Sequence, residues 1–159
     1  MPRKVFFSFH YERDNWRVAN VRSSNIIHDF DKTPFYDHAD WEAIKRRTGG
    51  IQTWIDNQLL GSSVTVVLIG NQTYSRPWVK YEIEQSWNRG NGLLGIYIHG
   101  MRNNNQEIDA PGRNPFSLIR MPGSTANLDS IVRIYDWVYD NGRENMANWI
   151  ELAAKQRNK

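Results

Sequence analysis

Trp78 and Glu82 are the two residues whose types and spacing could do chemistry together. They lie four positions apart in a segment that is predicted to be helical, because Ser75 can cap its amino end and Pro77 suits its first turn. Residues four apart share one face of a helix, so the indole and the carboxylate would be neighbours. A carboxylate can stabilise a positively charged sugar, and an indole can hold a flat cationic ring over its face.

Cleavage of the nicotinamide–ribose bond of NAD is a reaction that could use such a pair. Its transition state resembles an oxocarbenium ion, as in glycoside hydrolysis, and the neutral leaving group needs no general acid. The four-residue spacing alone is equally consistent with an ordinary structural role, in which the tryptophan packs in the core and the glutamate is solvated. Helical geometry does distinguish Glu82 from Glu84, which is expected on the opposite, solvent-facing side. Three apolar side chains of the same helix, also spaced by four, should pack on the sheet: Val79, Ile83 and Trp87.

The elements that would position these residues alternate between strand and helix about five times. The predicted strands are Val5–Phe9, Phe35–Asp37, Val64–Ile69, Leu93–Ile98 and Ile131–Val138. The predicted helices run from Asp14 or Asn15 to about His28, over one or two stretches between Trp41 and Leu60, from Ser75 to about Arg89, and onward from a cap at Asn141. The apolar positions are Trp16, Ala19, Val21 and Ile27 in the first helix and Met146, Trp149, Ile150 and Ala153 in the last.

This alternation predicts an α/β fold of the flavodoxin-like or TIR-like kind, with an open, mainly parallel five-stranded sheet and helices on both faces. The β-branched run Val64–Ile69 is typical of a parallel strand buried on both faces. In such folds ligands bind at the carboxyl ends of the strands, near the switch in strand order. The loops after Phe9, Asp37, Gly70 and Gly100 are therefore the places to expect a site. Residues 100–129, rich in Asn, Gly and Pro, predict a long surface excursion with a function or partial order of its own.

Composition narrows the functional classes. The 159 residues suit one domain spanning 1–159, and the absence of cysteine excludes disulfides, thiolate catalysis and cysteine-type zinc sites. No metal is expected. No apolar run approaches the length of a membrane span, and the apolar start is too short for a signal peptide, so we expect a cytoplasmic protein. Twenty basic residues are interspersed among seventeen acidic ones, which favours a small anionic ligand over nucleic acid.

Several other functions of this sheet topology are disfavoured. A response-regulator receiver needs a phosphorylatable Asp after the third strand, where the chain reads Gly70-Asn71-Gln72. FMN binding needs a small, hydroxyl-rich phosphate loop after the first strand, where bulky and charged residues 10–14 stand instead. GxxxxGK[ST] is absent, which disfavours P-loop enzymes. GxGxxG occurs at residues 90–95, but it runs into the strand predicted from Leu93 instead of joining a strand to a helix, so it does not indicate a dinucleotide-fold dehydrogenase.

Four ordered segments resemble those of TIR domains, and more closely those of the TIR-like proteins of the Thoeris antiphage system. They are the start from Lys4 to Asp14, the run from Ser62 to Gly70, the WxxxE helix from Trp78 to Glu82 preceded by Tyr74, and the segment Tyr135-Asp136-Trp137-Val138. The resemblance covers most of the chain and is weakest from Met101 to Asp129.

The resemblance implies a TIR-like fold and an enzyme that consumes NAD as a substrate, with no bound cofactor. In that family a cyclic ADP-ribose isomer is made and diffuses to a separate effector protein, and activity is switched on by infection. The glutamate of WxxxE is the catalytic residue, which corresponds to Glu82. The loop after the first strand contributes to the NAD pocket, which corresponds to Ser8, Phe9 and His10.

Other candidate substrate-binding residues each have an ordinary structural interpretation. Trp78 and Phe9 could simply be core, and His10 could be a surface histidine. Asp37 could bind ribose or belong to a turn, Arg76 could meet the pyrophosphate or be solvated, and Asn71 could reach the cleft or complete a turn. Two other functions stay open: a non-enzymatic TIR assembly module that self-associates, and an N-glycosyl transferase acting on nucleosides.

Overall fold

Four parallel strands form the sheet of the computed structural model, which describes residues 3–22, 46 and 50–159. They lie side by side in chain order: β1 (Val5–Ser8), β2 (Val64–Ile69), β3 (Gly92–Tyr97) and β4 (Arg133–Asp136). Ser8 lies opposite Val67, and Ile69 opposite Tyr97, so the strands end at the same edge of the sheet. The α/β class with a parallel sheet is confirmed with four strands, because the segment predicted as the fifth, Phe35–Asp37, lies outside the described residues.

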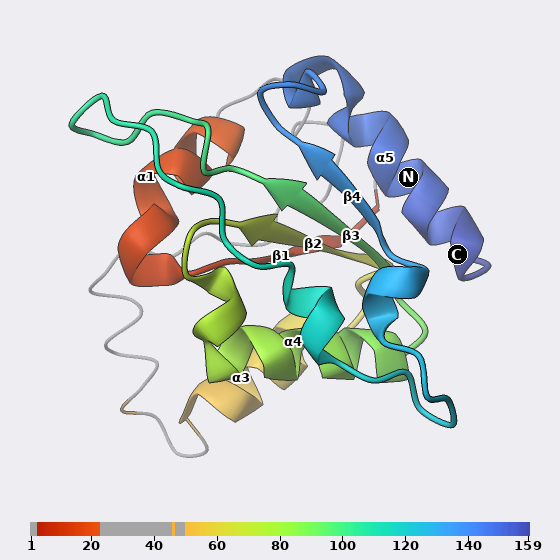
Figure 1. Ribbon diagram of the computed structural model, residues 1–159. Helices are drawn as coiled ribbons and strands as arrows, with labels where there is room; N and C mark the ends of the chain where they lie inside the picture. Colours follow the sequence, from red (N-terminus) through yellow and green to blue (C-terminus); the bar gives the residue numbers. More distant parts are fainter. Residues whose placement is uncertain (1–2, 23–45, 47–49) are drawn as a thin grey trace.

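Helices cover both faces of this sheet (Figure 1). On one face lie α1 (Tyr11–Arg22) and α5 (Gly142–Gln156), and on the other α3 (Gly50–Leu59) and α4 (Pro77–Asn88). Side chains of β2 alternate between the two: Val66 and Leu68 pack with α1 and α5, whereas Val67 and Ile69 pack with α4. All six residues of β2 are buried, which confirms the prediction of a strand covered on both faces.

The start of α1 differs from the prediction. The helix begins at Tyr11 rather than at Asp14 or Asn15, because His10 caps it. The Arg13 backbone N–H donates to Nδ1 of His10 at 3.3 Å, and the Asp14 N–H donates to the His10 carbonyl at 2.9 Å. The histidine thus takes the N-cap role that was predicted for a residue now inside the helix.

The buried face of α1 also differs from the prediction. Val18 and Val21 are buried, whereas Trp16 is 50 % exposed and Ala19 is exposed, so two predicted apolar positions were wrong. The other predicted position, Ile27, lies outside the described residues, as do most of the residues before α3 in the predicted stretch from Trp41.

The helix α4 follows its predicted pattern closely. Its N-cap is Arg76 instead of Ser75, because the Ser75 hydroxyl donates to the Gln72 carbonyl at 2.8 Å within the short turn η2 (Thr73–Ser75). Val79 and Ile83 are buried against the sheet, with Trp87 partly buried beside them, and Glu84 is exposed. The predicted separation of the two glutamates is confirmed.

The crossover between β3 and β4 is more ordered than a surface excursion. Parallel strands need a crossover, and here two short 3₁₀ turns, η3 (Pro115–Leu118) and η4 (Leu128–Ser130), lie beside α4 where a helix would usually pack. Phe116, Ile119 and Leu128 are buried against Val67 and Ile83. For these three residues the prediction of a surface segment was wrong, because they complete the core of the α4 face.

The last two elements confirm the predicted order with shifted ends. The strand β4 is shorter than predicted and begins at Arg133. Asn141 stands at the N-cap of α5, but in a left-handed conformation (φ 54°) and without a side-chain capping bond. The predicted apolar positions of this helix are buried: Met146, Trp149, Ile150 and Ala153. Among the described helices none is both long and apolar enough to cross a membrane.

Candidate active site

Glu82 and Ser8 meet at the carboxyl end of β1. Side chains alternate along this strand, so Ser8 shares with Phe6 the face that α3 and α4 cover, and α4 lies in contact with β1. Glu82 is 6 % exposed and Ser8 is fully buried. The fold therefore removes the Glu82 carboxyl from water and sets it beside the last residue of the first strand.

Burial decides the protonation of this carboxyl. Loss of hydration raises the pKa of Glu82 from 4.5 to about 8, and the nearby Ser8 hydroxyl offsets only part of that rise. Neither Oε2 of Glu82 nor Oγ of Ser8 makes a hydrogen bond of acceptable geometry with any described residue, so Ser8 is a close neighbour rather than a hydrogen-bond partner. The site holds a neutral acid at pH 7, with one carboxyl oxygen unused by the protein.

Trp78 lies between α3 and α4. Its ring meets that of Tyr81 edge-on, with centroids 5.8 Å apart and planes at 86°, and it packs on the cluster around Phe6 and Ile55. The Tyr81 hydroxyl donates to Oδ1 of Asp56 at 2.7 Å, which ties the two helices together. The packing interpretation of Trp78 is therefore realised, and a contact with a ligand ring stays a prediction.

The loop after β1 is well packed. Phe9 is partly buried and contacts the clusters on both faces of the sheet, which fits its core interpretation. His10 is 7 % exposed, so it is not a surface histidine, and its Nδ1 is engaged in capping α1. These residues follow Ser8 directly and so lie at the same edge of the sheet as Glu82.

Three predicted substrate-binding residues remain: Asn71, Arg76 and Asp37. Asn71 follows β2 and its amide donates to the Ala110 carbonyl at 3.1 Å, so it binds a neighbouring loop. The Arg76 side chain is half-buried and makes no hydrogen bond or ion pair with another described residue. Asp37 lies outside the described residues.

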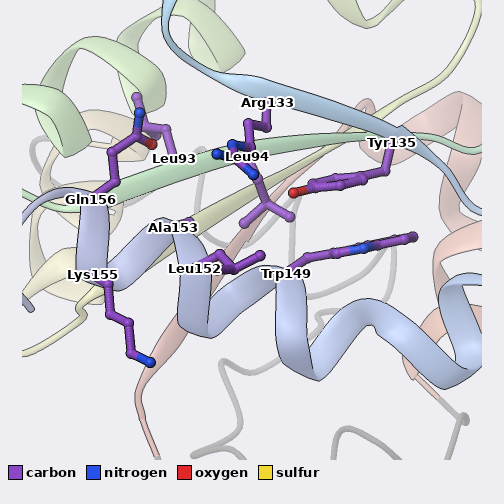
Figure 2. A pocket seen from close by; sticks show the side chains of 9 residues that line it. All are labelled: Leu93, Leu94, Arg133, Tyr135, Trp149, Leu152, Ala153, Lys155 and Gln156. Carbon is purple, nitrogen blue, oxygen red and sulfur yellow. The ribbon is translucent and has the colours of Figure 1, made fainter.

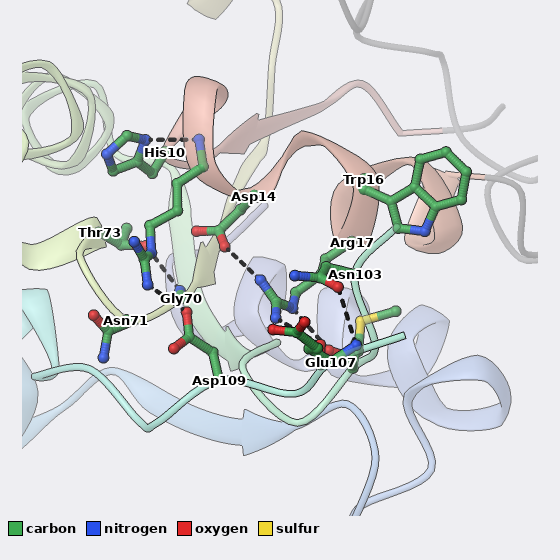
Figure 3. A network of polar contacts seen from close by, with 12 residues as sticks. His10, Asp14, Trp16, Arg17, Gly70, Asn71, Thr73, Asn103, Glu107 and Asp109 are labelled. Atoms are coloured by element: carbon green, nitrogen blue, oxygen red, sulfur yellow. Dashed lines mark hydrogen bonds and ion pairs between the residues drawn. The ribbon is translucent and has the colours of Figure 1, made fainter. Parts of the chain in front are cut away.

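A second buried carboxyl, which sequence reasoning assigned only to helix capping, lies at the end of β2 (Figure 3). Asp14 is fully buried, and its Oδ1 accepts a hydrogen bond from Arg17 at 3.3 Å. Burial raises the pKa of Asp14 to about 6, although the Arg17 and Arg13 charges oppose the rise. The spacing of Asp14 and Arg17, three residues apart in a helix, is the sequence signal that could have revealed this pair.

Arg17 also fixes the segment 101–112 over the carboxyl edge of the sheet. Its Nε donates to the Met101 carbonyl at 2.8 Å and its Nη2 to the Glu107 carbonyl at 3.2 Å. Arg13 adds an ion pair with Asp109 at 2.7 Å. Three contacts from one helix therefore hold this segment in place.

Two glycines allow close approaches at the carboxyl end of β2: Gly70 to α1, and Gly112 of the segment 101–112 to Gly70. A Cβ at Gly70 would lie 2.1 Å from Oδ2 of Asp14, and one at Gly112 would lie 2.2 Å from the Gly70 carbonyl oxygen. The Gly70 N–H donates to Oγ1 of Thr73 at 2.8 Å. Because only glycine allows this approach, the segment 101–112 can cover the carboxyl end of β2 closely.

Once ionised, the Glu82 carboxylate can stabilise a cation. In the described part of the chain no three His, Asp or Glu side chains gather as metal ligands. A parallel sheet with a buried WxxxE glutamate at the end of its first strand defines a TIR-like domain.

Comparison with known proteins gives the family. The family model for the TIR-like domain of the Thoeris protein ThsB matches residues 6–103, more than half of the chain, so the chain belongs to this family. A relative from Bacillus cereus (strain MSX-D12), named "Putative cyclic ADP-D-ribose synthase ThsB1", is 29 % identical over 191 residues, which cover 94 % of this chain and all of the relative.

Proposed function

We propose that this protein cleaves the nicotinamide–ribose bond of NAD and closes the ADP-ribose part into a cyclic product. The observation that carries the proposal is the buried Glu82 carboxyl, which has one oxygen without a partner among the described residues and lies beside Ser8. The name of the Bacillus cereus relative supports this class of product.

In the resting protein the raised pKa keeps Glu82 protonated. The positive charge of a bound nicotinamide ring would favour the ionised form, since an opposite charge nearby lowers the pKa of a carboxyl. The carboxylate would then stabilise the cation that develops at C1′ of the ribose as the C–N bond breaks. The electron pair of that bond goes to the nicotinamide nitrogen, and nicotinamide leaves as a neutral molecule.

The second step depends on excluding water. An adenine ring nitrogen or a hydroxyl of the same molecule attacks C1′, and a hydroxyl that attacks passes its proton to the Glu82 carboxylate. Water would compete and give linear ADP-ribose. The segment 101–112 is held by Arg17 and by the Asn71 contact with Ala110, and it would limit that competition at the carboxyl edge.

The wider role is proposed from what the resemblance to this family implies. The cyclic product would diffuse in the cytoplasm to a separate effector protein, and a phage-derived signal would switch the enzyme on, with self-association as a further level of control. Each of these roles requires the cleavage of NAD.

The test compares Glu82→Gln with Glu84→Gln, a matched change two residues away on the exposed side of α4. Proteins isolated from phage-challenged cells are given NAD, and nicotinamide and the nucleotide product are measured by chromatography and mass spectrometry. Glu82→Gln should lose about 10²–10³-fold in rate, the typical loss when one group that stabilises transition-state charge is removed. Glu84→Gln should match the wild type.

Equal rates for Glu82→Gln and the wild type would refute the site. Absence of nicotinamide release from the triggered wild type, with self-association intact, would favour the assembly module. Cleavage of free nucleosides in preference to NAD would favour the N-glycosyl transferase.

A further inference from the structure

A cavity of about 310 Å³ lies between β4 and α5 (Figure 2). It opens on the α1 and α5 face of the sheet, next to Arg133, the first residue of β4, and Leu93, near the start of β3. Glu82 lies under the opposite face, at the end of β1. The cavity is therefore separate from the candidate active site.

Apolar and aromatic groups form its walls. Tyr135 and Trp149 stack with their centroids 4.1 Å apart and their planes within 7° of parallel, so each ring holds the other in place. Leu94 and Ala153 are buried and line the interior. Figure 2 shows the Tyr135 hydroxyl directed toward Leu94 and into the space, at the end of a rigid ring.

The polar groups around the cavity are suited to an anion. Arg133 pairs in register with Leu94, so its side chain points to the α5 face, and it makes no hydrogen bond or ion pair with another described residue. Lys155 stands at the rim, and the Gln156 amide donates to the Ile131 carbonyl at 3.0 Å. None of the described residues that line the cavity is acidic. The lining residues thus carry positive charge, of which the Lys155 part is balanced by Glu151, whose pKa is lowered by Arg3 and to a lesser extent by Lys155.

We propose that this cavity binds a small organic anion of nucleoside monophosphate size. Its phosphate would lie between the Arg133 guanidinium and the Tyr135 hydroxyl, because the planar fork of arginine matches phosphate oxygens. Its flat, less polar body would lie on Leu94 and Ala153. The volume falls at the lower end of the 300–1,000 Å³ typical of ligand pockets, which suits one nucleotide and not a dinucleotide such as NAD. The inference is independent of the proposed NAD chemistry.

The test is calorimetric titration of the purified protein with AMP, adenosine and inorganic phosphate. The variants are Arg133→Gln, Tyr135→Phe and, as a matched control, Arg143→Gln, which makes the same charge change at an exposed position of α5 that does not line the cavity. Circular dichroism checks that each variant is folded.

AMP should bind, with adenosine and inorganic phosphate each weaker by at least about tenfold, since each lacks half of the contacts. Arg133→Gln should weaken AMP binding by about 10–100-fold, the range expected for hydrogen bonds to a charged group, and Tyr135→Phe by less. Arg143→Gln should bind AMP as the wild type does.

Four results would overturn the proposal: no AMP binding at millimolar concentration, equal binding of adenosine, equal binding of inorganic phosphate, or unchanged AMP affinity in Arg133→Gln. If Glu82→Gln abolished AMP binding while Arg133→Gln did not, AMP would occupy the candidate active site instead.

Discussion

Replacing Glu82 by glutamine should stabilise the protein, and more so as the pH rises. The carboxyl has a pKa of about 8 in the folded state against 4.5 for the ordinary group. Its contribution to stability is therefore fully present below pH 4.5 and is lost as the pH rises toward 8, because the unfolded chain gives up the proton and the folded chain retains it. Glutamine has nearly the same shape and no proton to lose.

The magnitude follows from the shift. At about 1.4 kcal/mol per pKa unit, the full change is about 5 kcal/mol and is approached above pH 8; it is about 4 kcal/mol at pH 8 and about 3 kcal/mol at pH 7. Urea unfolding of wild type and Glu82→Gln, measured from about pH 5 to pH 8, gives the difference in unfolding free energy at each pH. Asp14, whose folded pKa is also raised, is present in both proteins and cancels from that difference.

The matched variant Glu84→Gln should show a small and nearly flat difference from the wild type, because Glu84 is exposed. A difference for Glu82→Gln that stayed constant with pH, or that favoured the wild type at pH 8, would refute the reasoning that Glu82 is a desolvated acid. The prediction concerns the folded protein alone and holds whether or not NAD is the substrate.

Three further predictions concern activity and packing. The kcat/KM for nicotinamide release should rise with pH, reach half of its maximum near pH 8 and level off above that, because this parameter reports the ionisation of the free enzyme's Glu82; a fall between pH 6 and pH 8 would contradict it. Gly70→Ala should cost about 1–3 kcal/mol or more in urea unfolding, because its Cβ would lie 2.1 Å from the Asp14 carboxylate, whereas Gly100→Ala, with 3.6 Å to its nearest contact, should be tolerated. Arg17→Lys keeps the charge but loses the fork that reaches two carbonyls, so mass spectrometry should find a larger share of linear ADP-ribose, and an unchanged product ratio would argue against a role of the covering segment.

Local sequence patterns correctly predicted those features that depend only on residues close together in the chain. The β-branched run of β2 fixed a strand buried on both faces, since little else in the chain is so continuously apolar. The four-residue spacing on α4 separated Glu82 from Glu84, because helix geometry depends only on neighbouring residues. The apolar positions of α5 were predictable for the same reason.

Only the tertiary structure decided how those residues are used. Whether His10 caps a helix or contacts a ligand, and whether Asp14 is a cap or a buried acid, depends on where α1 begins and on the segment 101–112 that packs on it. The pKa of Glu82 depends on burial beside Ser8, which is far away in the chain. Periodicity in a sequence records which face of an element is apolar. Desolvation is set by the other elements that cover that face, and no short stretch of the chain contains that information.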